Sequence, residues 1–514
     1  MSRSKRFVTG LLSSYAAIGV NILYTLASVP LALHYLDKEE FGLWAVVTQL
    51  SGYLMLLEFG MTGSVARSLS DHKDQMEDGI YGNILRTGAR VFAIQGVLVA
   101  VMGLALAFLA PPLLDLPARL HHPFAILMAA QAVLSGLRLS LGALGSPLWC
   151  HQRLDLSNLS SSLSLVGTFA VLWIGFHLGW HVYSLTVSSV VGTFLSSFSI
   201  YLFCRRLGLY PPHEHRGRYD PRLFRELFHF GGGLFLMNLG AQLASASQVI
   251  IVSRLLGIEA AAVWSVATKI FNLAQQFVAR VLDSSAGSLA EMVVRGETGR
   301  LRDRFRDLVS ISAVMAVAAS AGIALLNGAF IEVWTAGKVT WASWNNLLLA
   351  CMLFSSAVTR CHTGLVGITK QVRGMKYVYL FEGVTFVTLS LLLVGWTGLT
   401  GLLGCALVCN ICITGIYATS RTASYLGISR RRVVGWSAQP IGILLLTAIF
   451  FVGTRLPFFA TLPAVPRLLV GLALFCVAVA PALWFMGMDA RLRHEVSALS
   501  NRILGKYLAR LKSI

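Results

Sequence analysis

The sequence predicts an all-α polytopic membrane protein, and three properties of its composition support this fold class. Of the 514 residues, 56% are hydrophobic and only 13% are charged, and the mean hydropathy is +0.69. A typical soluble domain carries about 25% charged residues, so the chain has too few charges to cover soluble domains of this total length. A soluble multidomain enzyme, a disordered chain and a disulfide-rich secreted module are therefore excluded.

Fourteen apolar stretches are long enough to form helices that cross a hydrocarbon core about 30 Å thick. They span residues 8–36, 41–63, 88–110, 123–146, 157–178, 183–203, 229–253, 259–288, 308–331, 345–368, 377–396, 398–420, 436–454 and 465–488. The first follows a basic start that holds Arg3, Lys5 and Arg6, and it is too long for the apolar region of a signal peptide. We therefore interpret it as the first transmembrane helix.

The basic residues alternate between the two sides of this helix map. When the N-terminus is placed in the cytoplasm, 32 of the 42 lysine and arginine residues lie in cytoplasmic segments and 6 lie in outer segments. The outer residues are Lys38, Arg119, Arg254, Lys338, Arg455 and Arg467. This asymmetry follows the positive-inside rule. It predicts that both termini are cytoplasmic, and it explains the net charge of +19 without nucleic-acid binding.

The loops predict that the protein is not an enzyme. The longest outer segments, 111–122, 332–344 and 455–464, are too short to fold as catalytic domains. The chain has no G-x-x-x-x-G-K-[ST] motif, so no ATPase of that type is built in. Nearly all of the 8 cysteines lie inside apolar stretches, where they lack the paired loop positions of disulfides and metal sites. We expect no cofactor and no metal.

Two pairs of segments repeat along the chain. YLDKEEFGLWAVV at 35–47 matches LLGIEAAAVWSVA at 255–267, and RLSLGALG at 138–145 matches RCHTGLVG at 360–367. The two offsets are almost equal, and both pairs occupy equivalent places in the helix map. They predict a duplicated six-helix unit, which transporters with parallel repeats arrange around a site between their halves.

The repeat divides the chain into four parts. These are an N-terminal six-helix bundle at 1–204, a cytoplasmic linker at 205–228, a second six-helix bundle at 229–430, and two extra helices with a basic tail at 431–514.

Charged residues inside the predicted helices mark a candidate binding cavity, because charge is costly at membrane depth. The candidate cationic residues are Arg138, Arg360, Lys269 and Arg280, and the possible coupling acids are Glu58 and Asp283. The polar residues predicted to line the same cavity are Asn21, Asn238, Gln242, Asn272 and Gln276. Arginine suits a phosphate group through its forked donors.

Structural explanations for these charges stay open. Arg280 and Asp283 are three residues apart on one helix, so they can neutralise each other. Arg138 and Arg360 can also extend toward the inner interface of the membrane.

Three segments resemble polysaccharide flippases of the Wzx type in the MATE/MOP exporter superfamily. EFGLWAVVTQLSGYLMLLEFGMTGSVARSLSD at 40–71 is similar to the second-helix signature of that family, 231–270 is similar to its seventh and eighth helices, and GALGSPLWCHQRLDLSN at 142–158 resembles its Q-R-x-D-x-x-N loop. Many relatives carry an acidic residue in the seventh helix near the position that Gln248 holds here.

The resemblance implies a function. Such exporters move an undecaprenyl-pyrophosphate-linked oligosaccharide from the inner to the outer leaflet of the bacterial cytoplasmic membrane by alternating access. It also implies two six-helix bundles with two extra helices, coupling to H⁺ or Na⁺, and contact with polysaccharide polymerase machinery.

Four other functions are weighed against this one. A MATE-type multidrug/cation antiporter needs an acidic or aromatic cavity, whereas the charges inside the helices are mainly basic. A membrane glycosyltransferase, polymerase or ligase needs a large outer loop or acidic catalytic groups. A scaffold that transports nothing does not need buried charges. A lipid II flippase stays open, as do the sugar repeat and the coupling ion.

Overall fold

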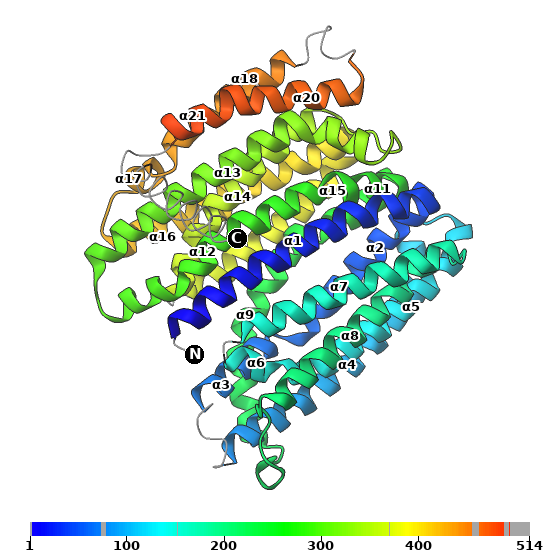
Figure 1. Cartoon of the computed structure of the whole chain (residues 1–514), viewed down its shortest axis with the longest axis vertical. Helices are drawn as coiled ribbons and strands as arrows, with labels where there is room; N and C mark the ends of the chain where they lie inside the picture. Colours follow the sequence, from blue (N-terminus) through cyan, green and yellow to red (C-terminus); the bar gives the residue numbers. More distant parts are fainter. Residues whose placement is uncertain are drawn as a thin grey trace, which may run out of the picture. The chain divides into compact units, whose positions relative to one another are not determined.

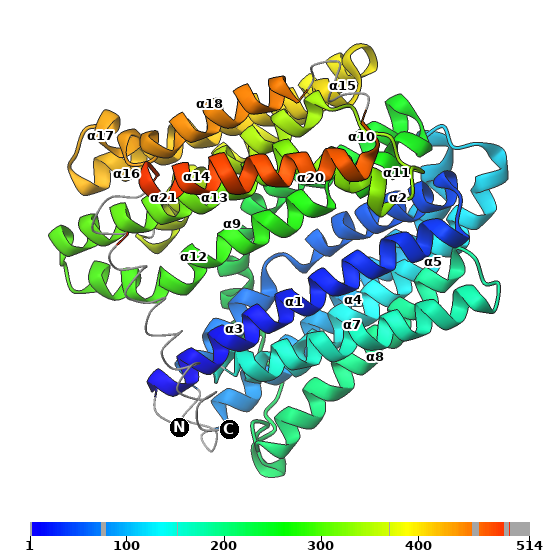
Figure 2. The same ribbon diagram turned by 45° about the horizontal axis from the view of Figure 1, so that its top comes forward.

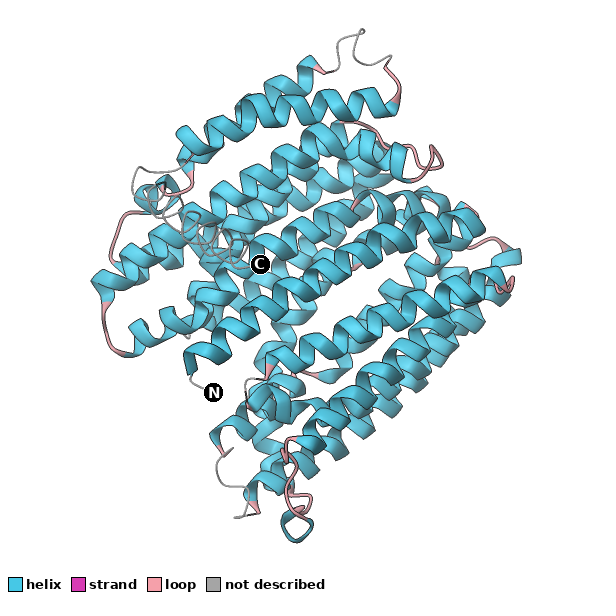
Figure 3. Ribbon diagram, viewed as in Figure 1, coloured by secondary structure: helices cyan, strands magenta, loops and turns pink. Residues whose placement is uncertain are grey.

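The structure, a computed structural model, describes residues 3–72, 79–151, 153–369, 371–454, 462–487 and 493. Its described part is almost entirely helical and holds no strand, which confirms the predicted all-α fold class (Figure 3). The chain divides into two compact units. Unit 1 comprises residues 1–269 and 373–402, and unit 2 comprises residues 270–372 and 403–514. Lys73, Lys370, Arg455 and most of the basic tail lie outside the described residues.

Unit 1 begins with eight helices. They are α1 (Arg3–Tyr35), α2 (Lys38–Leu54), α3 (Met61–Asp71), α4 (Ile80–Leu113), α5 (Ala118–Ser140), α6 (Ser146–Cys150), α7 (Leu154–His177) and α8 (Tyr183–Arg206). Helix α4 packs along α5, and α7 packs along both α1 and α8 (Figure 1). A Cβ atom on Gly136 would lie only 2.4 Å from the carbonyl oxygen of Gly96, so glycine lets α4 and α5 approach closely.

Helices from later in the chain complete unit 1. They are α9 (Pro221–Ser245), α10 (Ser247–Leu256), α11 (Ile258–Ala267) and the first part of α15 (Val372–Cys409). Helices α10 and α11 pack against α2. At the start of α2, Asp37 accepts the backbone N–H of Glu40 at 2.7 Å while the Glu40 side chain accepts the N–H of Asp37, which is a capping box. This cap explains why α2 begins directly after the turn from α1.

Unit 2 is built around the long helix α13 (Thr298–Trp334). Its other helices are α12 (Lys269–Val294), α14 (Trp344–Ile368), α16 (Ile416–Leu426), α17 (Arg430–Gly435), α18 (Ala438–Gly453), α20 (Ala464–Leu474) and α21 (Ala480–Phe485). Helices α14, α18 and α20 lie beside α13 (Figure 2). A cluster of Val317, Ala321, Ile443, Val479 and Leu483 buries one face of α13 against the helices near the C-terminus.

The described residues hold eleven helices that are long and apolar enough to cross a membrane, so the predicted count of fourteen is not confirmed. Within the described residues, each predicted stretch nevertheless lies mainly on helix. The pair 377–396 and 398–420 falls within one helical run of 54 residues, Arg373–Leu426. Gly398, at φ 63° and ψ −152°, interrupts the helical backbone between the two predicted members. The predicted helix 259–288 is divided between α11, which has only 10 residues, and α12, whose polar stripe lowers its hydropathy.

The predicted halves and the compact units divide the chain differently. Residues 229–269 and 373–402 belong to the predicted second bundle, and both segments pack into unit 1. The duplication is a relation between sequence segments, and the shared cavity that it implies stays a prediction.

Candidate functional site

Unit 1 contains a polar pocket of about 290 Å³ between the end of α2 and the middle of α9. Three of the predicted residues line it together, namely Glu58, Asn238 and Gln242, and Ser245 adds a hydroxyl group. The structure therefore brings one predicted coupling acid together with two predicted polar residues from a segment about 180 positions later in the chain.

The pocket exists because the second predicted helix is interrupted. After α2, Met55–Glu58 form a short 3-10 turn, and Phe59 (φ 51°) and Gly60 (φ 70°) both adopt the left-handed conformation before α3 begins. The left-handed conformation at a bulky residue such as Phe59 is strained and is common at functional sites. The ring of Phe59 packs on Phe235 of α9 at a centroid distance of 4.7 Å.

Glu58 has one local role in this interruption. Its carboxylate oxygen Oε1 accepts the backbone N–H of Thr62 at 2.8 Å, in the first turn of α3. A negative charge is favourable at a helix N-terminus. The carboxylate has no ion-pair partner among the residues that the structure describes. It therefore lines the pocket with one backbone donor holding it.

Amide side chains fix the walls of the pocket. Gln95 of α4 donates to the carbonyl oxygen of Glu58 at 3.0 Å, and Gln242 of α9 donates to the carbonyl oxygen of Gly52 at 3.1 Å. Tyr53 donates to the carbonyl oxygen of Gln242 at 3.2 Å. These bonds satisfy carbonyl groups near the place where the helix ends, so the polar groups on the walls are positioned before any ligand arrives.

Unit 2 contains a three-residue charged cluster on α12 and α14, defined here as the Asp283 cluster. Asp283 accepts a hydrogen bond from Arg360 at 3.1 Å and lies 3.9 Å from Arg280. All three side chains are between 41% and 51% exposed, so none of them is sealed inside the packed helices. Two guanidinium groups share one carboxylate, and the cluster carries a net positive charge.

A polar track on α14 leads to this cluster. Gln275 of α12 donates to Ser356 at 3.2 Å, and Ser355 donates to Asn410 at 2.8 Å. Asn410 begins a π-helical turn, Asn410–Gly415, which is a rare form that is frequent at functional sites. The sequence prediction missed Gln275, which lies beside the predicted polar stripe of α12 rather than on it, and Asn410, which is a lone polar residue in an apolar stretch and gives no periodic signal.

The other predicted cations lie apart from this cluster along the chain. Arg138 is exposed on the last turn of α5 in unit 1, and it has no ion-pair partner among the described residues. Lys269 is partly buried at the first residue of α12. Asn272 and Gln276 are exposed further along the same helix, and Asn21 of α1 is partly buried in unit 1.

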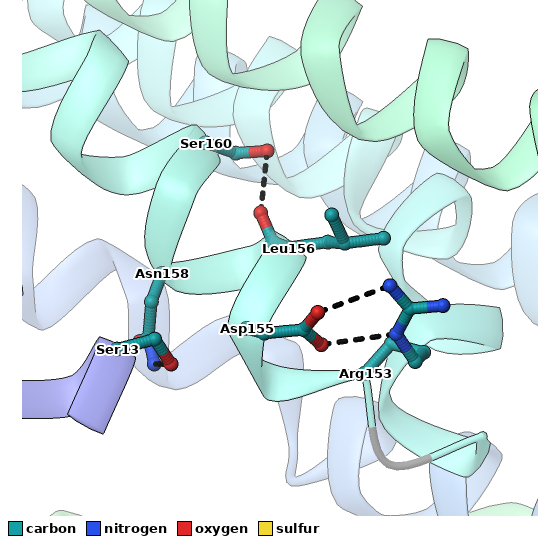
Figure 4. A network of polar contacts seen from close by, with 6 residues as sticks. All are labelled: Ser13, Arg153, Asp155, Leu156, Asn158 and Ser160. Atoms are coloured by element: carbon teal, nitrogen blue, oxygen red, sulfur yellow. Dashed lines mark hydrogen bonds and ion pairs between the residues drawn. The ribbon is translucent and has the colours of Figure 1, made fainter. Parts of the chain in front are cut away.

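The described part of the Q-R-x-D-x-x-N segment, residues 153–158, forms a junction of polar contacts at the start of α7 (Figure 4). Arg153 donates from Nε and Nη2 to the two oxygens of Asp155, both at 3.0 Å, and this bond raises the pKa of the Arg153 guanidinium. Asn158 of α7 donates to Ser13 at 3.1 Å and to Ser14 at 2.9 Å on α1. The motif therefore ties the start of α7 to α1. Gln152 lies outside the described residues.

The chain matches a family at the level of sequence, and its fold is similar to that of several solved membrane transporters. The profile described as "Polysaccharide biosynthesis protein" matches residues 9–285, which is more than half of the chain. Among curated proteins, no sequence matches significantly.

Several solved structures share the fold. An inward-facing multidrug resistance MATE family transporter of the MOP superfamily is 15% identical, with a TM-score of 0.66 over 79% of this chain and 95% of its own. The lipid II flippase MurJ, in an inward closed conformation, is 13% identical, with a TM-score of 0.66 over 91% of this chain and 97% of its own. A MOP superfamily transporter from Pyrococcus furiosus is 14% identical, with a TM-score of 0.62 over 83% and 97%.

Proposed function

Because the chain belongs to the polysaccharide biosynthesis protein family, we propose that it moves an undecaprenyl-pyrophosphate-linked oligosaccharide from the inner to the outer leaflet of the bacterial cytoplasmic membrane. The family match is the observation that carries this proposal. The eleven apolar helices show a multi-pass membrane protein, and its fold is that of the MOP transporters. Family and fold together support a membrane flippase and give no support to an enzyme.

The cargo explains why the protein keeps arginines inside apolar helices. A pyrophosphate carries about two negative charges, and moving them into hydrocarbon without partners is prohibitive. A flippase has to replace water around the pyrophosphate with fixed cations while the lipid tail stays in the bilayer. We propose that Arg138 of unit 1 and Arg360 of unit 2 do this, since guanidinium groups bind phosphate oxygens in a forked geometry.

The Asp283 cluster suits transient binding. Because one carboxylate is shared by Arg360 and Arg280, the cluster attracts an anion with about one net positive charge rather than two. Because its side chains are half-exposed, we propose that water enters with the cargo and makes the attraction weaker than in a dry site. Release after translocation then stays possible.

Glu58 is the better of the two candidate coupling acids. Asp283 already serves two arginines, whereas Glu58 has no cationic partner among the described residues and shares its pocket with Asn238 and Gln242. Acidic residues inside transporters take up protons, and oxygen groups at interrupted helices coordinate Na⁺. We propose that this pocket takes up the coupling ion during alternating access.

The function is tested with purified protein in liposomes that carry a fluorescent undecaprenyl-pyrophosphate oligosaccharide. The measurement is the fraction of the sugar that a soluble glycosidase reaches over time. We expect faster exchange than in empty liposomes and no effect of a cationic drug. Drug transport without lipid exchange would replace the proposal with an antiporter.

Lipid II flipping is the second candidate, and one observation favours it. The match to the lipid II flippase covers 91% of the chain, so it extends past residue 430 into the two extra helices, whereas the match to the multidrug transporter covers 79%. Lipid II has the same pyrophosphate with a different head group. Liposomes that carry lipid II distinguish the two candidates, since exchange of lipid II alone would support this second function.

The proposed orientation is tested by cysteine labelling from outside intact cells. Arg216 and Lys338 are both exposed, and they lie in segments predicted to be cytoplasmic and outer, respectively. In a background without the eight native cysteines, a membrane-impermeant maleimide should label Lys338→Cys and leave Arg216→Cys unlabelled. Labelling at position 216 would overturn the topology.

A further inference from the structure

A second polar pocket lies in unit 2, where the end of α13, the following loop and the start of α20 meet. It is at the opposite end of α14 from Arg360, and the predicted topology places it on the outer side. Its volume is about 270 Å³, slightly below the range of about 300–1,000 Å³ typical of drug-sized ligands. The pocket therefore fits one ring-sized group rather than an extended chain.

An acidic and a basic side chain form one wall of this pocket. Arg467 of α20 donates from Nη2 to Oε2 of Glu332 on α13, and the two side chains are 30% and 44% exposed. The bond uses a single carboxylate oxygen, so Oε1 of Glu332 can accept a further hydrogen bond among the residues that the structure describes. The two helices approach closely because of Gly471, where an added Cβ atom would lie 2.7 Å from the carbonyl oxygen of Leu325.

An indole ring forms another part of the wall, and buried amides hold it in place. The Nε1–H group of Trp341 donates to Oδ1 of Asn346 at 2.9 Å, and Asn327 donates to the same oxygen at 2.9 Å. Asn346 is fully buried, and its Nδ2 group has no hydrogen-bond partner in the described structure. That nitrogen lies toward Gly328, which lines the pocket: a Cβ atom there would be 3.0 Å from it. The polar end of the indole is therefore occupied, and the ring is rigidly oriented.

We propose that this pocket is a carbohydrate subsite that holds one neutral hexose or N-acetylhexosamine ring. The apolar face of a sugar packs on an aromatic ring, as Trp341 offers. Its hydroxyl groups donate to a carboxylate and accept from a guanidinium, as Glu332 and Arg467 offer side by side. Thr340 and Ser343 add further hydroxyl partners.

The charge of the wall argues against an anionic ligand. Glu332 neutralises Arg467, so the pair gives no net attraction for a phosphate, and the carboxylate repels a phosphodiester head group. The inference rests on the proposed function for the source of the sugar, which would be the head of a translocated lipid on the outer side. Binding of the free sugar is a property of the pocket alone.

Saturation-transfer difference NMR tests the subsite with full-length protein in nanodiscs. The probes are glucose, galactose and N-acetylglucosamine at millimolar concentration. We expect transfer to ring protons of at least one sugar, and Trp341→Ala should weaken the affinity by about tenfold, which corresponds to the loss of one aromatic contact. Glu332→Gln should also weaken binding, because it replaces a charged acceptor with a neutral one.

Trp344→Ala is the matched control. Trp344 lies three residues further along, is 55% exposed, and packs edge-on to Phe451 at 5.5 Å without lining the pocket. It should bind sugar like the unchanged protein. Thermal unfolding of each variant shows whether a loss of binding reflects a loss of folding, and Glu332→Gln gives an independent test if Trp341→Ala does not fold.

Three results would overturn the subsite. One is no transfer from any of the three sugars to the unchanged protein. Another is equal transfer in Trp341→Ala and in Trp344→Ala. The last is a protein that binds glycerophosphoethanolamine and none of the three sugars, with binding lost in Trp341→Ala. That result would show that the pocket is a site for a lipid head group. The outcome is separate from the proposed function, because Arg138→Ala should keep sugar binding even where it stops lipid exchange.

Discussion

Arg138 and Arg360 hold equivalent positions in the repeat, but their surroundings differ. Arg138 in unit 1 has no ion-pair partner among the described residues, whereas Arg360 in unit 2 donates to Asp283 at 3.1 Å. Asp283 also lies 3.9 Å from Arg280. Each site still carries an excess of one positive charge, from a lone arginine in one unit and from two arginines with one acid in the other.

At this pair of positions, the two halves of the repeat have the same excess charge but different ion-pair partners. For transport of an anion, net charge in a half-hydrated site matters more than the identity of each ion pair, because attraction over several ångströms follows the summed charge. Two predictions test this view directly, and two further predictions concern Glu58 and Asn158, which lie outside the two arginine sites.

The largest effect is expected from removal of either arginine. Arg138→Ala and Arg360→Ala should each lower the rate of lipid exchange in liposomes by about ten- to a hundredfold, since a hydrogen bond to a charged group contributes roughly 1.5–3 kcal/mol. Arg360→Lys should retain part of the activity, because it keeps the charge and loses the forked geometry. Surface polysaccharide in cells should fall with protein abundance unchanged.

Arg119→Ala is the control for this first prediction. Arg119 is 67% exposed and pairs with Glu39 in the predicted outer region, so its loss should leave exchange near normal. Normal export by both Arg138→Ala and Arg360→Ala would show that these arginines are structural.

The next prediction tests whether the net charge of the Asp283 cluster matters more than the presence of Arg360 itself. In the Arg360→Ala background, Asp283→Asn frees Arg280 and restores the excess positive charge of the cluster. We expect the double variant to recover exchange by about fivefold to tenfold over Arg360→Ala, a coupling of about 1 kcal/mol in a double-mutant cycle. The same Asp283→Asn change should give no recovery in the Arg138→Ala background. Recovery in both backgrounds, or in neither, would contradict the charge-count explanation.

A smaller effect is expected at Glu58, where two substitutions distinguish a role in ion coupling from a role in capping α3. Glu58→Gln keeps an oxygen for the N–H of Thr62 and loses the charge, so it should lower gradient-driven exchange with only a small fall in the unfolding temperature, from the lost charge at the N-terminus of α3. Glu58→Ala should in addition destabilise the protein by about 1 kcal/mol, the usual size of a lost cap. Both quantities come from proteoliposome assays and thermal melts of the same preparations. Full gradient-driven activity in Glu58→Gln would restrict Glu58 to capping.

The smallest effect concerns the junction between α1 and α7. Asn158→Ala removes two hydrogen bonds to Ser13 and Ser14, which should lower stability by about 1–2 kcal/mol with less than twofold change in exchange. Denaturant unfolding measures the first and the glycosidase assay measures the second. Asn158→Asp is the matched variant, because it keeps the acceptor oxygens and loses the donor. A large loss of exchange in a stable Asn158→Ala protein would give the junction a direct role in transport.

The positions of the predicted helices were accurate where the length of an apolar stretch and its helical periodicity determine the structure. Within the described residues, each of the fourteen predicted stretches lies mainly on helix, since about twenty apolar residues have few other stable forms in a membrane. The separation at 377–396 and 398–420 also corresponds to a real backbone change, because Gly398 adopts a conformation that only glycine takes readily. The interruption at Phe59 and Gly60 was not predicted, since hydropathy continues across it.

The sequence by itself determined the fold class, the membrane setting, the family and the candidate charges, because composition, helical periodicity and motif spacing are local properties. It also showed that Arg280 and Asp283 share a helix face, since they are three residues apart. Tertiary structure alone decided that Asp283 pairs more closely with Arg360, 77 residues away, and that Glu332 meets Arg467, 135 residues away. Such pairs depend on which helix faces pack together, and that choice is made by the summed burial of whole helices rather than by the charged residues themselves.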